Sequence, residues 1–337
     1  MDATEDAASR CPARSGDTRF ILGRPLTETA EYFLRQAGWC EGRSPLYASL
    51  CRQLAGDRRV DPLIGPPRWD APLRLLAGVH YLVLVGKATW DDVGAALDEH
   101  AAFLGRFVAE REVQTNEVQR SWALLPAILS IADGRPLDLL ELGSAAGLNL
   151  VWDRFAYRYS AGTWGGGPLV LAGDDRVPPP AALLSRRTTV ARRRGVDRSP
   201  IDVTTEEGAL LLESFVWADQ EDRVARLRAA IDVVRDDPPQ LIRGDYVRDL
   251  PALLDDRVPG AQLIVYETAS TQYLDREQRS SLHEALHYAG RAEPLTFLTT
   301  RSNAGQDFYS LEAISWPSGR RREIEELDFH GAWLRWL

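Results

Sequence analysis

Acidic residues follow three apolar runs in the second half of the sequence. Glu141 follows the run 137–140, and Asp197 and Asp245 end two later runs. If these runs form parallel strands, their carboxyl ends share one edge of the sheet, where ligands bind in open α/β folds. Carboxylates there accept hydrogen bonds from the ammonium, ribose hydroxyl and adenine amino groups of a nucleotide-like cofactor. The alternative role for each acid is to cap the following helix, and Asp245 by itself favours that role.

The segment from Gly143 to Gly147 has the composition of a ligand-binding loop between a strand and a helix. A dinucleotide fingerprint, G-x-G-x-x-G, is excluded because Ala145 stands where the middle glycine belongs. A P-loop is excluded because no lysine follows Gly147. A nucleophile elbow, G-x-S-x-G, is excluded because Ser144 lies one position before the centre. The remaining pattern is acidic-x-Gly-x-Ala-x-Gly.

This pattern resembles motif I of the class I S-adenosylmethionine-dependent methyltransferases, whose loop holds a cofactor that has no phosphates. The resemblance implies that S-adenosylmethionine is the cofactor and that its site begins at the end of the first strand. The cofactor-binding residues then expected from this region and the later strand ends are Glu141, Gly143, Ser144, Ala145, Gly147, Asn149, Asp197, Asp245 and Tyr246. The alternative is a tight strand–helix turn that binds no ligand.

Short apolar runs alternate with helical patterns from residue 137 onward. A helix is expected directly after the loop, then a Gly- and Pro-rich insertion at about 160–180. The sequence Pro317-Ser318-Gly319 predicts a hairpin in the tail. Residues 133–337 are therefore expected to form an α/β domain with a seven-stranded, Rossmann-like sheet of the class I methyltransferase type. Its first five strands are expected at 137–142, 188–197, 241–245, 262–267 and 295–298, with helices at about 206–234 and 276–289.

The first part of the chain has apolar residues at helical spacing, from residue 26 to 131. The run 79–85 is apolar enough for a strand, but its position among helical patterns favours a buried helix. We expect a helical N-terminal or cap domain at 19–132. Residues 1–18 are small, polar and charged, which predicts a disordered tail.

The composition of the 337-residue chain favours a cytoplasmic protein. A net charge of −9 argues against binding to a nucleic-acid duplex, so the arginine clusters at 186–194 and 320–322 are interpreted as solvated faces or partner contacts. No apolar run approaches the ~20 residues of a membrane span, and the chain does not begin like a signal peptide. Three cysteines without metal-ligand spacing fit a reducing compartment. We expect a small-molecule substrate, no nucleic-acid, membrane or metal partner, and leave homodimer formation open.

Several motifs resemble the bacterial domain-of-unknown-function 2332 family over nearly the whole chain from about residue 25. The most specific are Arg-Glu-Val-Gln-Thr-Asn-Glu at 111–117 and the segment 141–150, followed by Asp153-Arg154. The family is grouped with methyltransferase-like folds, so the resemblance supports fold and cofactor more than substrate. Supporting matches lie at 44–47, 195–197, 200–203, 244–245 and 330–337.

The fourth expected strand departs from the family pattern, which places a His–Thr or His–Ser pair at its end. Here the strand ends with Glu267 and Thr268, at the position that faces the methyl-transfer site in class I enzymes. We expect Glu267 to act as the catalytic base or to bind a cationic substrate, if burial raises its pKa, with Thr268 beside the substrate. The alternative is that Glu267 caps the next helix. His330 is a further substrate candidate, although a structural role explains it more simply.

Polar residues before the first strand occupy the region that closes over the cofactor in class I methyltransferases. The resemblance implies that Gln114, Thr115 and Asn116 bind the methionine part of the cofactor. Arg111 or Arg120 would then pair with its carboxylate. The alternative is a polar contact between helices.

The sequence also contains H-E-x-x-H, the zincin pattern, at His283, Glu284 and His287. On a helix both histidines share a face, and the glutamate can activate a zinc-bound water. The segment falls where an amphipathic surface helix is expected. A third ligand is not evident, because Glu293 is too close and Glu312 lies in an expected strand. A zinc metallopeptidase is therefore the least favoured function.

The favoured function is an S-adenosylmethionine-dependent transferase that moves a methyl group to oxygen or nitrogen of a small molecule. A second interpretation keeps the cofactor but transfers or cyclises its aminocarboxypropyl group. A third is a cofactor-binding scaffold without catalysis. The products separate them: S-adenosylhomocysteine marks methyl transfer, and methylthioadenosine marks aminocarboxypropyl chemistry.

Overall fold

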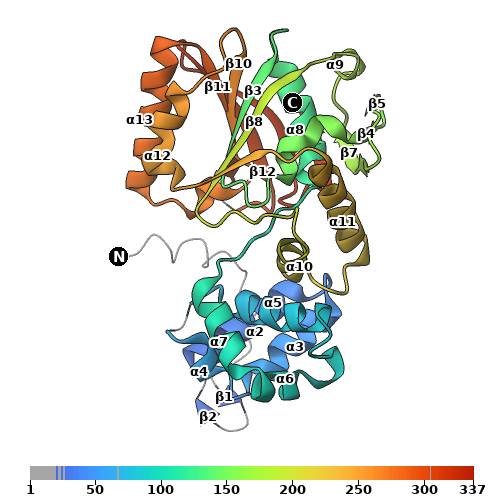
Figure 1. Ribbon diagram of the computed structural model, residues 1–337. Coiled ribbons are helices and arrows are strands. Elements are labelled where there is room, and N and C mark those ends of the chain that lie inside the picture. The colour runs from blue at the N-terminus through green and yellow to red at the C-terminus, as the bar shows by residue number, and fades with distance from the viewer. Residues whose placement is uncertain (1–19, 22–23, 26, 67, 304) are drawn as a thin grey trace. The chain divides into compact units, whose positions relative to one another are not determined.

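The structure is a computed structural model that describes residues 20–21, 24–25, 27–66, 68–303 and 305–337 (Figure 1). The chain divides into two compact units. The helical unit contains the described residues up to Thr115 together with Thr205–Arg228, and the α/β unit contains the described residues of 116–204 and 229–337. The division after residue 115 differs from the expected one after 132, and the helical unit takes its second segment from within 133–337. The tail expected at 1–18 lies outside the described residues.

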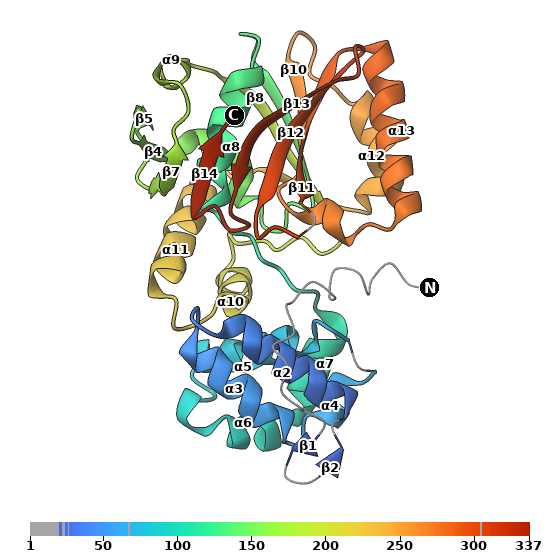
Figure 2. The same cartoon turned by 180° about the vertical axis from the view of Figure 1, so that it is seen from behind.

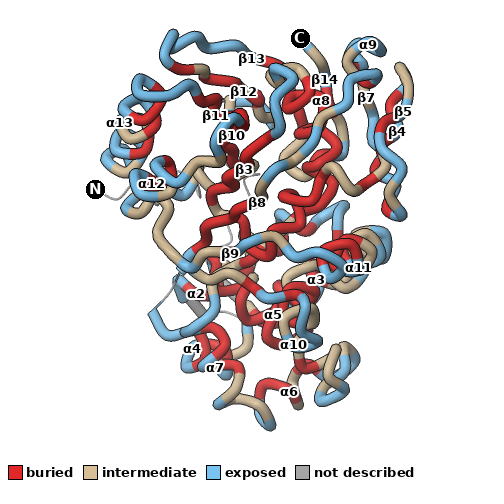
Figure 3. The backbone as a smooth tube through the Cα atoms, turned by 45° about the horizontal axis from the view of Figure 1, so that its top comes forward, coloured by how far each residue is buried: buried red, intermediate tan, exposed pale blue. Residues whose placement is uncertain are grey.

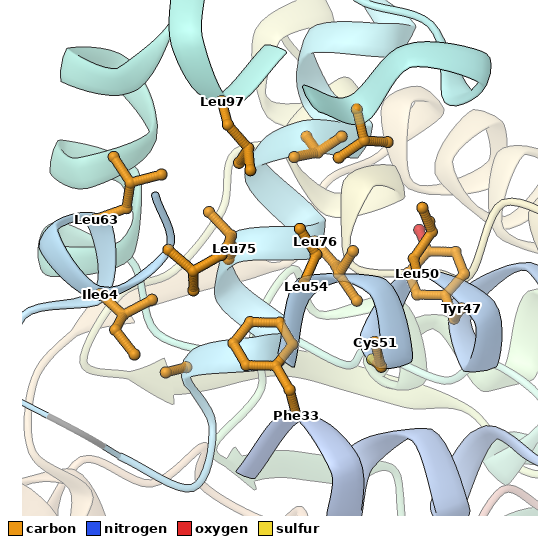
Figure 4. Packing of buried hydrophobic residues seen from close by; sticks show 14 of the residues in the cluster. Phe33, Tyr47, Leu50, Cys51, Leu54, Leu63, Ile64, Leu75, Leu76 and Leu97 are labelled. Carbon is orange, nitrogen blue, oxygen red and sulfur yellow. The ribbon is translucent and has the colours of Figure 1, made fainter. Parts of the chain in front are cut away.

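Helices of the helical unit pack their apolar faces into one core. Helix α2, for example, begins after Thr27, whose Oγ1 accepts the N–H of Ala30 at 3.2 Å. Figure 4 shows Phe33 of α2 beside Leu54 and Leu75 from two other helices of this core. The elements are β1 (Phe20–Ile21), β2 (Arg24–Pro25), α2 (Glu28–Cys40), α3 (Pro45–Ala55), α4 (Asp61–Ile64), α5 (Ala71–Leu84), η1 (Trp90–Asp92), α6 (Val93–Glu99) and α7 (Ala101–Glu110). The apolar run at 79–85 lies in α5, which confirms the predicted buried helix.

The second segment of the helical unit supplies α10 (Glu206–Ser214) and the start of α11 (Glu221–Asp236). The single helix predicted over 206–234 is therefore two helices. Ser44 Oγ donates to Asp219 Oδ1 at 2.6 Å, across 175 positions of sequence. His80 Nδ1 lies 3.2 Å from the Ser214 carbonyl oxygen, across 134 positions. The unit thus needs both segments to satisfy its buried polar groups.

The main sheet of the α/β unit has nine strands among the described residues, where seven were predicted. Five of them are parallel neighbours in the order β9-β8-β3-β10-β11. The chain leaves β3 toward β8 on one side and later returns to β10 on the other, so β3 and β10 flank a topological switch point. The parallel strands are β3 (Leu137–Leu142), β8 (Val190–Asp197), β9 (Gln240–Arg243), β10 (Gln262–Tyr266) and β11 (Leu295–Ser302).

The other side of the sheet is an antiparallel meander. Strands β12 (Tyr309–Trp316) and β13 (Arg320–Leu327) form the hairpin predicted at 317–319, and β14 (Trp333–Trp336) pairs with β13. Strand β7 (Asp174–Val177) then adds in parallel to β14. The Gly- and Pro-rich insertion also supplies a separate three-stranded sheet, β5-β4-β6, with β4 (Ala156–Tyr159), β5 (Gly162–Gly165), β6 (Val170–Ala172) and α9 (Ala181–Leu184).

Helices cover both faces of the main sheet (Figures 1 and 2). Leu140 and Leu142 of β3 pack with α12 (Tyr246–Asp255) and α13 (Arg276–Ala292) in one apolar core. Helix α8 (Arg120–Ile131) lies on the opposite face, where Arg322 of β13 donates to Ser130. Because alternate residues of a strand point to opposite faces, Glu141 lies on the α8 face. Figure 3 shows that β3 and β10 are buried along their length.

In the described part of the chain, no helix has both the length and the apolar character needed to cross a membrane.

Candidate functional site

The loop after β3 has a strained but well-bonded backbone. Gly143 and Gly147 both have φ of 72°, and Ala145 has φ of 51°, the left-handed region that costs a non-glycine residue about 1–2 kcal/mol. The Gly143 N–H donates to the Val196 carbonyl at 2.8 Å, which joins the loop to β8. A helix follows the loop as predicted. It is a 3₁₀ helix, η2 (Leu148–Arg154), and its backbone departs from helical angles at Val151.

The two loop glycines are required by contacts with the chain itself. A Cβ on Gly143 would lie 2.5 Å from the Cβ of Ser270, and one on Gly147 would lie 2.9 Å from Cγ of Pro239. Both residues also have positive φ, which favours glycine. Close packing and turn geometry therefore explain these glycines without close approach of a ligand.

Three acids meet at the carboxyl ends of β3, β8 and β10. Glu141 is fully buried, and burial raises its pKa well above the usual range. The nearby charges of Asp197 and Glu267 raise it further, while that of Arg120 lowers it. Asp197 ends β8 and Glu267 follows β10, the two strands that pair with β3, so the structure brings together acids that are far apart in sequence. Such a cluster favours a cation or a hydrogen-bond donor as its ligand.

The other two predicted strand-end acids hold the backbone. Asp197 accepts the Ala145 N–H at 2.9 Å and the Ser199 N–H at 2.8 Å, which ties the loop to the end of β8. Asp245 caps α12, because its Oδ1 accepts the N–H groups of residues 247 and 248. The capping alternative for Asp245 is thus seen directly. Tyr246 follows it, and burial raises the pKa of this phenol to about 12.

Glu267 is fully buried directly after β10 and is held by four hydrogen bonds. Its Oε1 accepts from Thr299 Oγ1 at 2.7 Å and from the N–H and hydroxyl of Thr300 at 2.7 and 3.2 Å. Its Oε2 accepts only the Thr271 N–H, at 3.3 Å. This last contact lies in η3 (Ser270–Tyr273), so Glu267 also satisfies the start of the next helical turn. Thr268 follows it and is half-buried.

Three polar atoms around Glu141 are buried without a hydrogen-bond partner among the described residues: Glu141 Oε2, Ser144 Oγ and Asn149 Nδ2. Ser144 Oγ lies 2.3 Å from where a Cβ on Gly195 would stand, and Gly195 pairs with Glu141 on one side. Tyr266 pairs with Glu141 on the other side, and its hydroxyl donates to the Asn149 carbonyl at 3.2 Å. The unpaired groups thus flank one carboxylate. Because buried polar atoms are rarely left unpaired, this is where a ligand is expected.

The start of α8 packs on the turn between β13 and β14. Arg120 Nε donates to the Phe329 carbonyl at 2.9 Å, and its guanidinium lies 4.5 Å from the centre of the Phe329 ring. The His330 ring lies 4.9 Å from the same phenyl ring. Phe329 therefore holds the predicted residue His330 near Arg120. The charge of Arg120 in turn lowers the pKa of Glu141.

The predicted residues before α8 fall on both sides of the unit boundary. Asn116 belongs to the α/β unit, where its Oδ1 accepts the Leu148 N–H at 3.0 Å and fixes the start of η2. Gln114 is buried and Thr115 is half-buried, and both belong to the helical unit. Only Asn116 of the three can thus be placed against the β3 loop.

The H-E-x-x-H segment lies in α13 and has ordinary surroundings. The His283 ring lies 6.1 Å from the Phe297 ring, and burial lowers its pKa. Glu284 accepts the Ser280 hydroxyl at 3.0 Å, and His287 is exposed. In the ranges that the structure describes, no group of three or more His, Cys, Asp or Glu side chains could hold a metal ion. Nothing in these contacts supports the zincin interpretation.

The arginines at 192–194 are strand residues paired within the chain, so their interpretation as a solvated face is wrong. Arg192 and Arg194 both bond Asp138, at 2.8 and 3.5 Å, and Arg193 bonds Asp153 at 2.5 Å. Asp138 is almost fully buried. The cluster balances buried charge at β3 and β8, which the local sequence pattern did not indicate.

Ser121 and Tyr266 are site residues that were not predicted. Both are fully buried and contact Asn149, Ser121 from α8 and Tyr266 from β10. In the sequence, Ser121 could have been singled out as a polar residue in an otherwise apolar helical run. Tyr266 carried a similar signal, as a tyrosine at the end of an apolar strand.

The fold and this polar cluster define a mixed α/β protein with buried, unpaired acceptors and donors at the switch point of its sheet. The chain belongs to a family described as uncharacterized proteins conserved in bacteria (DUF2332), which matches residues 30–336. Comparison with curated proteins and with solved structures found no match.

Proposed function

We propose that this protein is an S-adenosylmethionine-dependent transferase that moves a methyl group to oxygen or nitrogen of a small molecule. The observation that carries the proposal is the unpaired, fully buried Glu141 Oε2, at the end of the central strand where the strand order reverses. Ligands of open α/β sheets bind at such switch points. Motif I of class I methyltransferases, which the loop resembles, has the same place in the fold.

The chemistry of the cluster fits this cofactor. S-adenosylmethionine carries an ammonium and a sulfonium cation, and Glu141 and Asp197 supply negative charge or acceptors for them. Its carboxylate needs donors, and the unpaired Asn149 amide supplies one. Arg120 adds positive charge near Glu141. A phosphate ligand would fit less well, because three acids surround the loop.

When bound, the cofactor supplies an electrophilic methyl group. The contribution of the protein is then to place the accepting atom in line with that group, which can account for much of the rate increase. Glu267 is suited to this task because four hydrogen bonds fix it, while Oε2 accepts only one of them. The remaining acceptor capacity of Oε2 can bind or deprotonate an amine or hydroxyl of the substrate.

Calorimetry of the full chain with S-adenosylmethionine tests the cofactor assignment. We expect wild type to bind, and Glu141→Gln to weaken binding at least about tenfold, because a charge-assisted hydrogen bond is lost. Glu325→Gln is a matched control: Glu325 is also fully buried and unpaired, but lies on β13, four strands and about 19 Å from β3. This control should bind like wild type. A wild-type chain that does not bind the cofactor contradicts the proposal.

Product analysis with candidate acceptors tests the reaction. Methyl transfer yields S-adenosylhomocysteine, whereas methylthioadenosine would indicate aminocarboxypropyl chemistry. We expect Glu267→Gln to lower kcat by about 10²–10⁴-fold if Glu267 is the base, with cofactor affinity little changed. The glutamine keeps an Oε1 acceptor for Thr299 and Thr300 and loses the 3.3 Å contact with the Thr271 N–H, so thermal unfolding is measured in parallel to establish that the variant is folded. Cofactor binding without turnover for any acceptor would instead indicate a scaffold.

A further inference from the structure

Asn149 is held in place by two buried hydroxyl groups from different elements. Ser121 Oγ, in the first turn of α8, donates to Asn149 Oδ1 at 2.7 Å. The Tyr266 hydroxyl, at the end of β10, donates to the Asn149 backbone carbonyl at 3.2 Å. Both donors are fully buried. The backbone and the side chain of Asn149 are therefore each fixed by their own hydrogen bond.

The Ser121 contact decides which atom of the Asn149 amide remains available. Because Oδ1 accepts from the serine, the Nδ2 donor is directed away from it, and Nδ2 has no partner among the described residues. Rotation of the amide would direct Nδ2 at the serine oxygen, which can also accept, and would turn the Oδ1 acceptor toward the ligand. A bound carboxylate therefore favours the observed orientation.

The available donor and an available acceptor are connected through Tyr266. Asn149 is bonded to Tyr266, which is the register neighbour of Glu141 on β10. Glu141 Oε2 is unpaired and fully buried. A donor next to a carboxylate matches a group that carries both an anion and a cation, as the α-amino-acid end of S-adenosylmethionine does.

We propose that Ser121 is a positioning residue that turns the Asn149 amide so that Nδ2 donates to the carboxylate of the amino-acid end, while Glu141 accepts from the ammonium. The inference rests on the proposed function, since it assigns one end of that cofactor to this cluster. Ser121 acts through Asn149 and does not itself contact the ligand. Selectivity for the amino-acid end thus depends on a hydroxyl of α8, outside the β3 loop.

Two ligands distinguish this role from a structural one. S-adenosylmethionine carries the amino-acid end, and 5′-methylthioadenosine shares its adenosine and methylthio groups but lacks that end and the sulfonium charge. We expect Ser121→Ala to weaken binding of S-adenosylmethionine about tenfold, since one hydrogen bond is misdirected, and to leave binding of methylthioadenosine unchanged. Ser130→Ala is the matched control, because Ser130 is a hydroxyl of the same helix that bonds Ala127 and Arg322 instead. It should change neither affinity.

Asn149→Asp provides a second variant of almost the same shape. Ser121 can still donate to the new side chain, but an acceptor replaces the Nδ2 donor and repels a carboxylate. We expect a larger loss for S-adenosylmethionine than in Ser121→Ala, again without loss for methylthioadenosine. Thermal unfolding of each variant is followed in parallel to establish that it is folded.

The outcomes test the cofactor assignment and the positioning role of Ser121 separately. If wild type binds neither ligand, the cofactor assignment itself fails. If wild type binds S-adenosylmethionine but a folded Ser121→Ala variant binds it equally well, the positioning role is wrong while the cofactor stands. An equal loss for both ligands also overturns the positioning role, because it indicates general damage to the site.

Discussion

Ser270 rests directly on Gly143, and its Oγ donates to the neighbouring Leu142 carbonyl at 2.7 Å. The contact joins the segment after β10 to the segment after β3, so the two loops at the switch point have a fixed mutual position. A side chain on Gly143 would disturb both loops at once.

Gly143→Ala should therefore destabilise the protein more than its backbone angle alone requires. We expect a loss of about 3 kcal/mol in the free energy of unfolding, from left-handed strain and from overlap with Ser270. Gly260→Ala is the control: Gly260 has φ of 77°, but its Cβ would meet no atom within 4 Å. This control should lose only about 1 kcal/mol. Urea denaturation measures both, and equal losses would contradict the packing argument.

Binding of S-adenosylmethionine should release a proton from Glu141. Burial and the charges of Asp197 and Glu267 raise the pKa of this carboxyl in the free protein, so below that pKa it is protonated. An ammonium ligand favours the carboxylate form, so affinity should increase with pH until the raised pKa is passed and then level off. Calorimetry in buffers with different ionisation enthalpies measures the released proton. Glu141→Gln should bind without this release, and a release that persists in the variant would point to another group.

Glu325 should make the protein less stable as pH increases. Both of its carboxyl oxygens are buried without a partner among the described residues, and burial raises its pKa well above the usual range. In the unfolded chain the Glu325 side chain ionises near pH 4.3. Between that pH and the raised pKa, the free energy of unfolding therefore falls by up to about 1.4 kcal/mol per pH unit. Glu325→Gln removes this contribution. Its stability relative to wild type, from urea denaturation at pH 5 and pH 8, should increase with pH; a constant difference would show that Glu325 does not titrate as expected.

Asp219 should stabilise the helical unit more than an acid that bonds only its neighbours. Its two oxygens accept the Ser44 hydroxyl at 2.6 Å and the Leu46 N–H at 3.1 Å. Asp219→Ala leaves both donors unpaired, and we expect a loss of about 2 kcal/mol. Asp57→Ala, which removes only bonds to Arg59, should lose less than about 1 kcal/mol. Hydrogen exchange of the first amides of α3 should accelerate in the Asp219 variant alone.

Strands whose burial is continuous could be predicted from the sequence. Strand β10 is apolar after Gln262, and β3 is apolar apart from Asp138 and Glu141, because both faces of these strands are covered. The tail hairpin followed from its Pro-Ser-Gly turn. The helix after Gly147 was also predicted, but its 3₁₀ type could not be, since the apolar residues of 148–152 are buried all round and carry no helical period that would separate an α-helix from a 3₁₀ turn.

Side-chain partners across the sheet could not be predicted in the same way. Glu325 lies in a run of charged residues that indicates solvent exposure, yet the register shift between Leu311 and Glu312 on the paired strand accompanies a fully buried carboxyl. Asp245 shows a second reason why side-chain partners could not be predicted. A strand-end acid and a helix cap have the same local sequence, and only the structure shows the cap.

The two-segment helical unit has a consequence for how the chain is made. During translation the segment up to Thr115 emerges first, but its partners for Ser44 and His80 lie at Asp219 and Ser214. About a hundred residues must be synthesised in between, which takes on the order of ten seconds at bacterial elongation rates. The early helices therefore lack these partners while the first strands of the sheet are being synthesised. A fragment of residues 1–204 would lack these partners altogether. Because each unit is built from separate stretches of sequence, neither can be isolated by truncating the chain at one point.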